Sequence, residues 1–350
     1  MSAVVLPAPL SRLDATWFDE ALPSRGRARV VDVACESLPV SGAVGELARV
    51  RLSYGDGEPG PASVIAKFRG TSENQRAMDA ALGIYDRERH FYAEVAASVP
   101  VASPRCFFAG DGHRTPLLLE DLAGLRVVDQ VLGLRLADAE RLMDTLAGLH
   151  ARFWGRPLPT GSDWAVSLTD PMFAGMLTQL LGSGVSTLRE RYADRVEPGM
   201  LVALETNAPH WSSVLARCDE GPRTLVHNDC RADNIFFTAE DEPVLIDWQI
   251  PAHSRGTQDV AYLLSGSLDP RLLSTSWEAL LRRYHQRLAV PDYSWDQCLT
   301  HYRQSLLYTL TPGVAMLGAM AIAGDDRGLA ESMVLRTVAH AAELDAFSTL

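Results

Sequence analysis

The stretch LVHNDCRADNIFF, from Leu225 to Phe237, sets the strictest condition on how this chain can fold. An apolar run enters it and another leaves it, which predicts two short buried strands. The residues between these runs are nearly all polar or charged. Because buried polar groups are costly unless they are paired, such a dense polar loop between buried strands indicates a role in binding or chemistry.

The segments 234–237 and 244–247 are predicted to pair as an antiparallel hairpin around the turn TAEDEP. If Phe237 and Val244 flank the turn, counting outward from them places Asn234 opposite Asp247. An amide oxygen and a carboxylate oxygen at the mouth of the hairpin suit Mg²⁺, which keeps several waters and binds substrate phosphates. We therefore expect Asn234 and Asp247 to be metal ligands.

Asp229 lies on the loop that leads into the same end of the hairpin. Its carboxylate can accept the proton of a hydroxyl group that attacks phosphorus, while positioning and charge neutralisation supply most of the catalysis. His227 directly follows the entering strand, so we expect it to hold the loop through backbone hydrogen bonds. A polar loop that only satisfies backbone groups explains either residue alone, but the joint spacing favours a functional site.

Lys67 lies inside the apolar strand VIAKF, where an unpaired ammonium would be costly. On the helix that follows, Glu88 shares one stripe with Ile84, Phe91 and Val95. We therefore predict a Lys67–Glu88 ion pair that aims the ammonium at nucleotide phosphates. The alternatives are a pair with Glu94 or Glu73, which lie off the stripe, or a Lys67 that extends into solvent at a sheet edge.

Two further segments are candidates for nucleotide contacts. Gly42 and Gly45, in SGAVGE, would let backbone N–H groups approach phosphate oxygens, although a plain hairpin turn has the same appearance. The run LLLEDL ends with Glu120, Asp121 and Leu122, and its backbone would offer N–H and C=O groups to an adenine edge. Ordinary solvated residues of a connector are the alternative for Glu120 and Asp121.

The 350 residues suit two lobes better than one core. In the first 120 residues, alternating or apolar runs predict an antiparallel sheet with one main helix at 72–99, which is broken near Gly83. The rest is mainly helical apart from the hairpin region at 224–248. We expect an α+β fold with a nucleotide-binding lobe at 1–120, and a helical lobe at 121–350 that holds the catalytic hairpin and the acceptor site.

Charge and cysteine content exclude several classes. The net charge is −12, so a nucleic-acid surface is not expected. We see neither a signal peptide nor an apolar run that could span a membrane. The cysteines are scattered and odd in number, which argues against a disulfide framework and favours the cytoplasm.

Taken as a set, these motifs resemble the aminoglycoside-phosphotransferase-like superfamily of small-molecule kinases, in particular its ecdysteroid-kinase-like and choline-kinase-like branch. The resemblance covers roughly residues 40–270 and rests on HNDCRADN, LIDWQ, VIAKF, ERHFY and LLLEDL. It implies a bilobal protein-kinase-like fold, with Asp229 as catalytic base, Asn234 and Asp247 as Mg²⁺ ligands, and Lys67 on the phosphates with Glu88. It also makes Asp259, in GTQD, similar to a buried Asp that braces the catalytic loop, although a helix N-cap is the alternative.

One departure from that pattern concerns the catalytic loop. Asn228 stands where the superfamily usually has Gly. Asn is the next best residue for a left-handed backbone, so activity is still expected. Trp248 and Gln249 follow Asp247 where protein kinases have Phe-Gly, which favours a site that needs no activation-loop switch.

The sequence thus predicts an O-phosphotransferase that uses ATP or GTP with Mg²⁺ and acts, as monomer or homodimer, on a small-molecule hydroxyl such as that of an antibiotic, a sterol-like alcohol or an amino alcohol. A catalytically silent nucleotide-binding pseudokinase or ligand sensor is the alternative. A Cys-His hydrolase built on Cys230 and His227 lacks an oxyanion-hole glycine pattern. His150 is expected to be a satisfied core histidine. Aromatic residues that could wall an acceptor pocket, or simply fill the core, are Trp154, Trp164, Phe173, Trp211, Tyr262, Trp295 and Tyr302.

Overall fold

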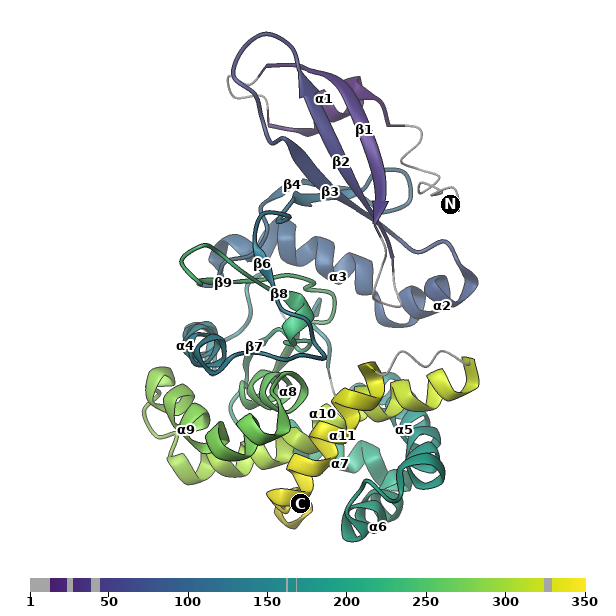
Figure 1. Cartoon of the computed structure of the whole chain (residues 1–350), viewed down its shortest axis with the longest axis vertical. Coiled ribbons are helices and arrows are strands. Elements are labelled where there is room, and N and C mark those ends of the chain that lie inside the picture. Colours follow the sequence, from purple (N-terminus) through teal and green to yellow (C-terminus); the bar gives the residue numbers. More distant parts are fainter. Residues whose placement is uncertain (1–12, 24–27, 39–44, 162, 168, 324–328) are drawn as a thin grey trace. The chain divides into compact units, whose positions relative to one another are not determined.

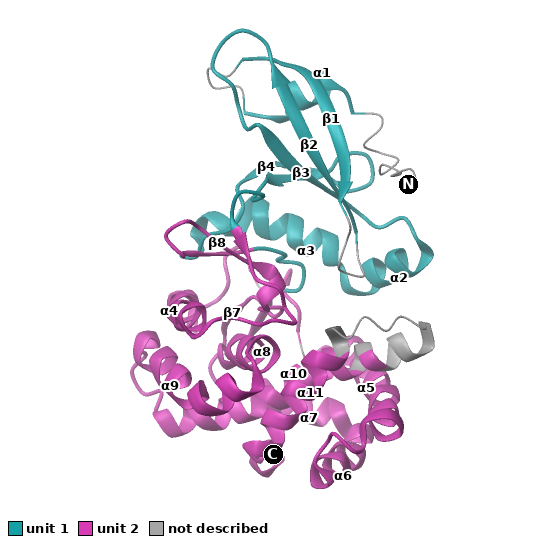
Figure 2. Cartoon of the chain, viewed as in Figure 1, with its two compact units in different colours: residues 1–125, 246–250 teal, residues 126–245, 251–350 magenta. Residues whose placement is uncertain are grey.

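The computed structural model of the chain describes residues 13–23, 28–38, 45–161, 163–167, 169–323 and 329–350 (Figure 1). It divides into two compact units (Figure 2). Unit 1 comprises residues 1–125 and 246–250, and unit 2 comprises residues 126–245 and 251–350. Within the described ranges, no helix has both the length and the apolar character that crossing a membrane requires.

Unit 1 contains a five-stranded antiparallel sheet in the order β1-β2-β3-β5-β4. Its core side includes Ala48, Val50 and Leu52, which are alternate residues of strand β2, together with Phe18 of helix α1. Arg51, on the other side, is exposed, as a strand with one buried face requires. The elements are α1 (Ala15–Ala21), β1 (Val30–Leu38), β2 (Glu46–Tyr54), β3 (Ser63–Phe68), β4 (Cys106–Ala109) and β5 (Leu117–Glu120).

The predicted main helix of unit 1 is divided at Gly83, as expected. Helix α2 (Glu73–Leu82) begins after Ser72, which forms a reciprocal capping box with Gln75. It ends at Gly83, whose φ of 60° is left-handed. Helix α3 (Ile84–His90) starts there and continues through a π-helical turn, η2 (Phe91–Val95), and a 3₁₀ turn, η3 (Ala96–Ser98). This break lets α3 leave at a new angle and carry Glu88.

Unit 2 is mainly helical, and its longest helix, α10, packs against α5, α8 and α11 (Figure 1). Two small sheets carry the hairpin region, in the orders β6-β8-β9 and β10-β7. The strands are β6 (Arg126–Val127), β7 (Thr224–Val226), β8 (Ile235–Phe237), β9 (Pro243–Leu245) and β10 (Ala252–Ser254). The α-helices are α4 (Leu136–Phe153), α5 (Pro171–Tyr192), α6 (Pro198–Asn207), α7 (Trp211–Cys218), α8 (Thr257–Ser267), α9 (Pro270–Leu288), α10 (Trp295–Ala323) and α11 (Leu329–Glu343). The 3₁₀ turns are η4 (Ala208–His210), η5 (Ala232–Asn234) and η6 (Ala346–Thr349).

The hairpin forms where it was predicted, but its register was predicted wrongly by one residue. Phe237 pairs with Pro243 and Ile235 with Leu245, so Asn234 does not fall in register with Asp247. The loop closes with the N–H of Thr238 donating to the carbonyl of Glu242 at 3.0 Å. Asp241 adopts a left-handed φ of 62° within this loop, which shortens the connection relative to the symmetric turn that was assumed.

Candidate active site

The Lys67 side chain is buried in unit 1 between two carboxylates. Val64, Ala66 and Phe68 face the core of the sheet, so the strand alternation turns Lys67 to the opposite face. There its Nζ lies 2.8 Å from Glu88 Oε1 and 2.8 Å from Asp247 Oδ1. Only 7% of Lys67 is exposed. The predicted Lys67–Glu88 pair is therefore confirmed, and neither Glu94 nor Glu73 is needed.

The pKa values of this trio reflect burial and charge. Burial alone would lower the pKa of the Lys67 ammonium, but Asp247 and Glu88 outweigh it and raise that pKa above its ordinary value. Burial raises the pKa of the Glu88 carboxyl to about 7, against the opposing effect of Lys67. The ammonium is thus held charged, which is the state that would bind phosphate.

Asp247 lies two residues after the end of the hairpin strand β9 and belongs to unit 1. Its φ is 65°, a left-handed conformation that turns the chain out of the strand. The next residue, Trp248, is fully buried and stacks on Phe91 with ring centroids 4.0 Å apart. This stack fixes the segment beside the helical stripe that carries Glu88, so Asp247 reaches Lys67.

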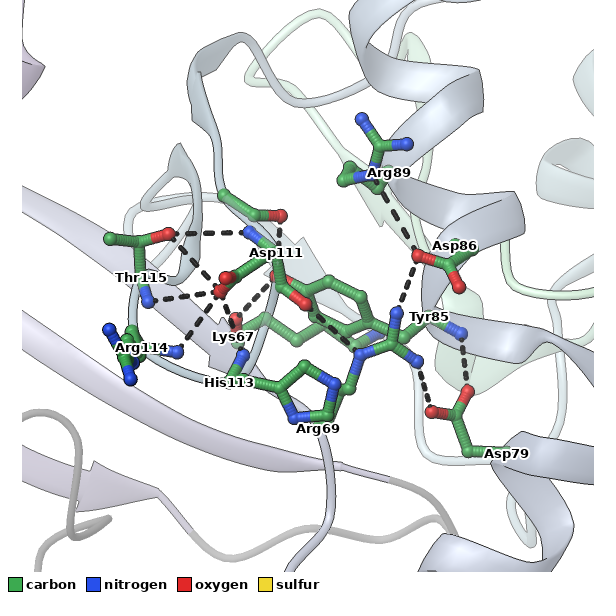
Figure 3. Close-up of polar contacts among 11 residues, drawn as sticks. Lys67, Arg69, Asp79, Tyr85, Asp86, Arg89, Asp111, His113, Arg114 and Thr115 are labelled. Atoms are coloured by element: carbon green, nitrogen blue, oxygen red, sulfur yellow. Dashed lines mark hydrogen bonds and ion pairs between the residues drawn. The ribbon is translucent and has the colours of Figure 1, made fainter.

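Arg69 ties strand β3 to the start of helix α3 (Figure 3). Its guanidinium bonds to Asp79 and, at 2.5 Å, to Asp86, and it lies over the Tyr85 ring. Asp79 in turn accepts a hydrogen bond from the backbone N–H of Tyr85 at 2.9 Å. Asp79 therefore caps the helix that begins after Gly83, and Arg69 holds the cap in place. The roles of Arg69 and Asp79 were not predicted from the sequence.

A turn at residues 111–115 completes this anchor (Figure 3). The Asp111 carboxylate accepts hydrogen bonds from the backbone N–H groups of Arg114, His113 and Thr115. These bonds, with Arg114 the largest contributor, lower the pKa of Asp111 to about 2. The Asp111 carbonyl accepts a hydrogen bond from Arg69 Nε at 3.0 Å, so the turn also restrains the Arg69 side chain.

The other predicted nucleotide contacts lie in unit 1. Gly42 is outside the described residues. Gly45 has a φ of 108°, and an added Cβ would lie 3.0 Å from the Phe68 carbonyl, so this position needs glycine. At the end of β5, the N–H of Glu120 donates to Arg105 and the carbonyl of Leu122 accepts from Leu125. Asp121 is structural, since it binds Arg49 at 2.7 Å.

In unit 2 the loop after β7 is braced by Asp259. Its two carboxylate oxygens accept the backbone N–H groups of His227 at 2.7 Å and Asn228 at 2.8 Å. Helix α8 has no side-chain cap and its N-cap is Gly256, so Asp259 braces the loop and is not an N-cap. His150 contacts the same carboxylate at 3.2 Å and is fully buried, as expected of a satisfied core histidine. His227 also accepts the N–H of Asp229 through Nδ1, which confirms its holding role.

Asp229 and Asn234 are held together within unit 2. The Asn234 amide nitrogen donates to the Asp229 carbonyl at 2.9 Å and to its carboxylate at 2.8 Å. Because the nitrogen is used in this way, the amide oxygen is the atom of Asn234 that could bind a cation. An amide oxygen is a hard-oxygen donor, so Asn234 fits the predicted role of a Mg²⁺ ligand.

Arg231 was not predicted as a site residue, yet it lies beside Asp229. Arg231 Nε lies 3.5 Å from Asp229 Oδ1, and its Nη1 lies 2.7 Å from Asp233. Burial raises the pKa of the Tyr262 phenol well above its ordinary value, and the charge of Asp229 raises it further. The Asp-x-Arg spacing in this polar loop could have predicted a role for Arg231. A cation two residues from a carboxylate can balance the charge of that carboxylate.

The remaining predictions for unit 2 concern Cys230 and the aromatic residues. Cys230 is almost fully buried, and burial raises the pKa of its thiol well above the ordinary value, so it does not suit nucleophilic attack. Of the aromatic candidates, Trp211 and Tyr302 are fully buried core residues that bond to Thr311 and His340. Tyr262 instead lines a cavity of about 10 Å³, room for about one water.

Comparison with known proteins places this chain in a family. The sequence profile of the ecdysteroid kinase-like family matches residues 41–152 and 171–291, well over half of the chain. No protein of curated function matches the chain in sequence.

Solved structures show the same fold. Choline kinase LicA from Streptococcus pneumoniae superposes with a TM-score of 0.54 at 15% identity, covering 90% of this chain and 94% of that one. Choline kinase from Cryptosporidium parvum gives 0.53 at 12% identity and 91% of both chains. A GDP complex of an aminoglycoside 2′-phosphotransferase gives 0.53 at 16% identity, covering 90% and 92%. At such identities the likeness concerns the fold alone, and it confirms the predicted protein-kinase-like class.

Proposed function

Because the chain belongs to the ecdysteroid kinase-like family, we propose that it transfers the γ-phosphoryl group of ATP or GTP, with Mg²⁺, to a hydroxyl group of a small molecule. The observation that carries the proposal is the buried Lys67, held charged between Glu88 and Asp247. A buried ammonium with two carboxylate partners is costly to build for stability alone. It suits a site that receives a polyphosphate.

In this proposal each polar group has one task. Lys67 binds phosphate oxygens and Glu88 aims it. Asp229 orients the acceptor hydroxyl and takes its proton. Asn234 and Asp247 would hold Mg²⁺, which supplies neutralisation of phosphate charge. Arg231, beside Asp229, adds a second cation for the transferred group.

The base of the nucleotide would contact backbone at the end of β5. The N–H of Glu120 and the carbonyl of Leu122 already form hydrogen bonds within the protein. The carbonyl of Glu120 and the N–H of Leu122 are therefore the groups that would bind the base. This donor–acceptor pair matches the edge of an adenine ring. Gly42 and Gly45 would let the backbone approach the phosphates.

The pseudokinase alternative rested on Asn228. Asn228 adopts a left-handed φ of 69°, a conformation that Asn tolerates better than most residues, which favours an active enzyme over that alternative. We also propose a cytoplasmic location, since the five cysteines are all free, as is usual in a reducing compartment.

The test is a phosphotransfer assay over a panel of antibiotics, sterol-like alcohols, sugars and amino alcohols. ADP or GDP release should depend on Mg²⁺ and on one acceptor class. In an Asp229→Asn variant, turnover with that acceptor should fall by about a hundredfold or more, because the base is lost, while nucleotide affinity stays unchanged. Equal turnover in this variant would reassign the base, and release with no acceptor class would refute the function.

A further inference from the structure

Asn228 occupies a backbone position that ordinary residues avoid. Its φ is 69°, and the residue lies between the strand β7 and Asp229. Only 4% of Asn228 is exposed, so its amide group is withdrawn from water. A glycine would adopt this conformation without any side chain to satisfy. The asparagine instead brings a buried amide, whose oxygen needs a donor.

Helix α10 supplies that donor. The Tyr308 hydroxyl lies 2.5 Å from Asn228 Oδ1 and donates to it. Tyr308 is 5% exposed, and burial raises its pKa above the ordinary value, so the phenol stays a donor throughout the physiological pH range. The bond joins residues 80 positions apart in the chain.

The backbone and the side chain of Asn228 are thus held from two different helices. Asp259 of α8 binds the N–H groups of His227 and Asn228. Tyr308 of α10 binds the Asn228 side chain. The brace through Asp259 fixes where the loop begins, and the contact with Tyr308 fixes the peptide that directly precedes Asp229.

We propose that Tyr308 is a positioning residue for Asp229, and that it acts by clamping the Asn228 side chain in its left-handed conformation. The inference rests on the proposed function for the meaning of Asp229, but the clamp itself is a property of unit 2. Without the hydroxyl, a buried amide oxygen has lost a donor, and the loop relaxes to pair it elsewhere. Asp229, the next residue, moves with it, and displacements of this kind near a reacting group cost rate.

A double-mutant cycle between Tyr308→Phe and Asn228→Gly tests the clamp. Two readouts are measured: kcat and KM for the nucleotide in the phosphotransfer assay, and the carboxyl ¹³C NMR signal of Asp229 in the nucleotide-free protein. Tyr308→Phe alone should lower kcat by about ten- to a hundredfold with the nucleotide KM unchanged, and should shift the Asp229 signal. In the Asn228→Gly background, where no amide needs the hydroxyl, the same change should alter kcat by no more than about twofold and leave the signal in place.

Tyr302→Phe is the matched control. Tyr302 is a fully buried tyrosine of the same helix, and its hydroxyl bonds to His340 at 3.0 Å, not to the loop. Its loss should lower stability yet leave kcat and the Asp229 signal unchanged. Equal losses from Tyr308→Phe in both backgrounds, or an unchanged kcat, would overturn the proposal. If the wild-type protein transfers no phosphate, the proposed function fails, and the Asp229 signal still decides whether the clamp exists.

Discussion

Unit 1 holds a lysine at a depth where lysine is rarely found. Glu88 is 1% exposed and Lys67 7%, so their charges are almost fully withdrawn from water. Asp247, whose side chain is 27% exposed, is the third member and the one in contact with solvent. The trio carries one excess negative charge when all are ionised, which suits it to a divalent cation.

The raised pKa of Glu88 makes stability depend on pH. A carboxyl whose folded pKa is about 7 binds its proton more tightly in the folded than in the unfolded chain. Its contribution to stability is therefore complete below the ordinary carboxyl pKa and is lost as pH rises through about 7. A Glu88→Gln variant does not titrate and should lack this loss.

Urea unfolding of wild type and Glu88→Gln from pH 5 to pH 8 checks this. The unfolding free energy of the variant minus that of the wild type should increase with pH, with a slope of at most about 1.4 kcal/mol per pH unit. A difference that stays flat, or that falls as pH rises, would mean that Glu88 is not the group that titrates.

At the level of elements, helix α3 is useful only if its start is fixed, because the start determines where Glu88 points. Arg69→Gln removes the cation that holds Asp79 and Asp86 (Figure 3). Since Asp79 is 8% exposed, removing its counter-charge, with only the Tyr85 N–H left as a partner, should cost about 1–3 kcal/mol in the free energy of unfolding. Arg89→Gln is the control, because Arg89 lies 3.9 Å from Asp86 on the surface and should change stability by less than about 0.5 kcal/mol. Similar losses in both variants would deny Arg69 its special role.

The brace of the catalytic loop gives a second prediction at this scale. Gly256 precedes α8, and a Cβ there would lie 2.5 Å from the Tyr284 hydroxyl and 2.6 Å from His150 Nδ1. Gly256→Ala should therefore displace the His150 contact to Asp259 and destabilise the protein by about 1–3 kcal/mol. Gly148→Ala, in an exposed part of α4 where a Cβ meets nothing within 4 Å, should instead stabilise it by up to about 1 kcal/mol. Thermal or urea unfolding of the two variants distinguishes these signs, and a neutral Gly256→Ala would contradict the packing described.

For the whole molecule, local patterns predicted most of the fold. The alternating pattern of strand β2 and the break at Gly83 could be predicted because each depends on residues close in sequence. The Lys67–Glu88 pair was also predictable, since two buried charges on neighbouring elements must resolve each other.

Features that depend on distant contacts escaped prediction. The one-residue error in the hairpin register came from the left-handed Asp241, which composition does not reveal. The stack of Trp248 on Phe91 joins segments far apart in the chain, and the donor for Asn228 comes from Tyr308 on a remote helix. Such partners are set by tertiary packing, which a single sequence does not display.

The proposed function depends most directly on Lys67, Asn234 and Asp247 binding one nucleotide with its metal. Isothermal titration of MgATP against wild type, Lys67→Ala, Asn234→Ala, Asp247→Asn and Asp229→Asn measures this directly. The account predicts that the first three variants each weaken binding by about tenfold or more, which is about 1.4 kcal/mol, while Asp229→Asn binds as the wild type does. Wild-type affinity for MgATP in both Asn234→Ala and Asp247→Asn would contradict it.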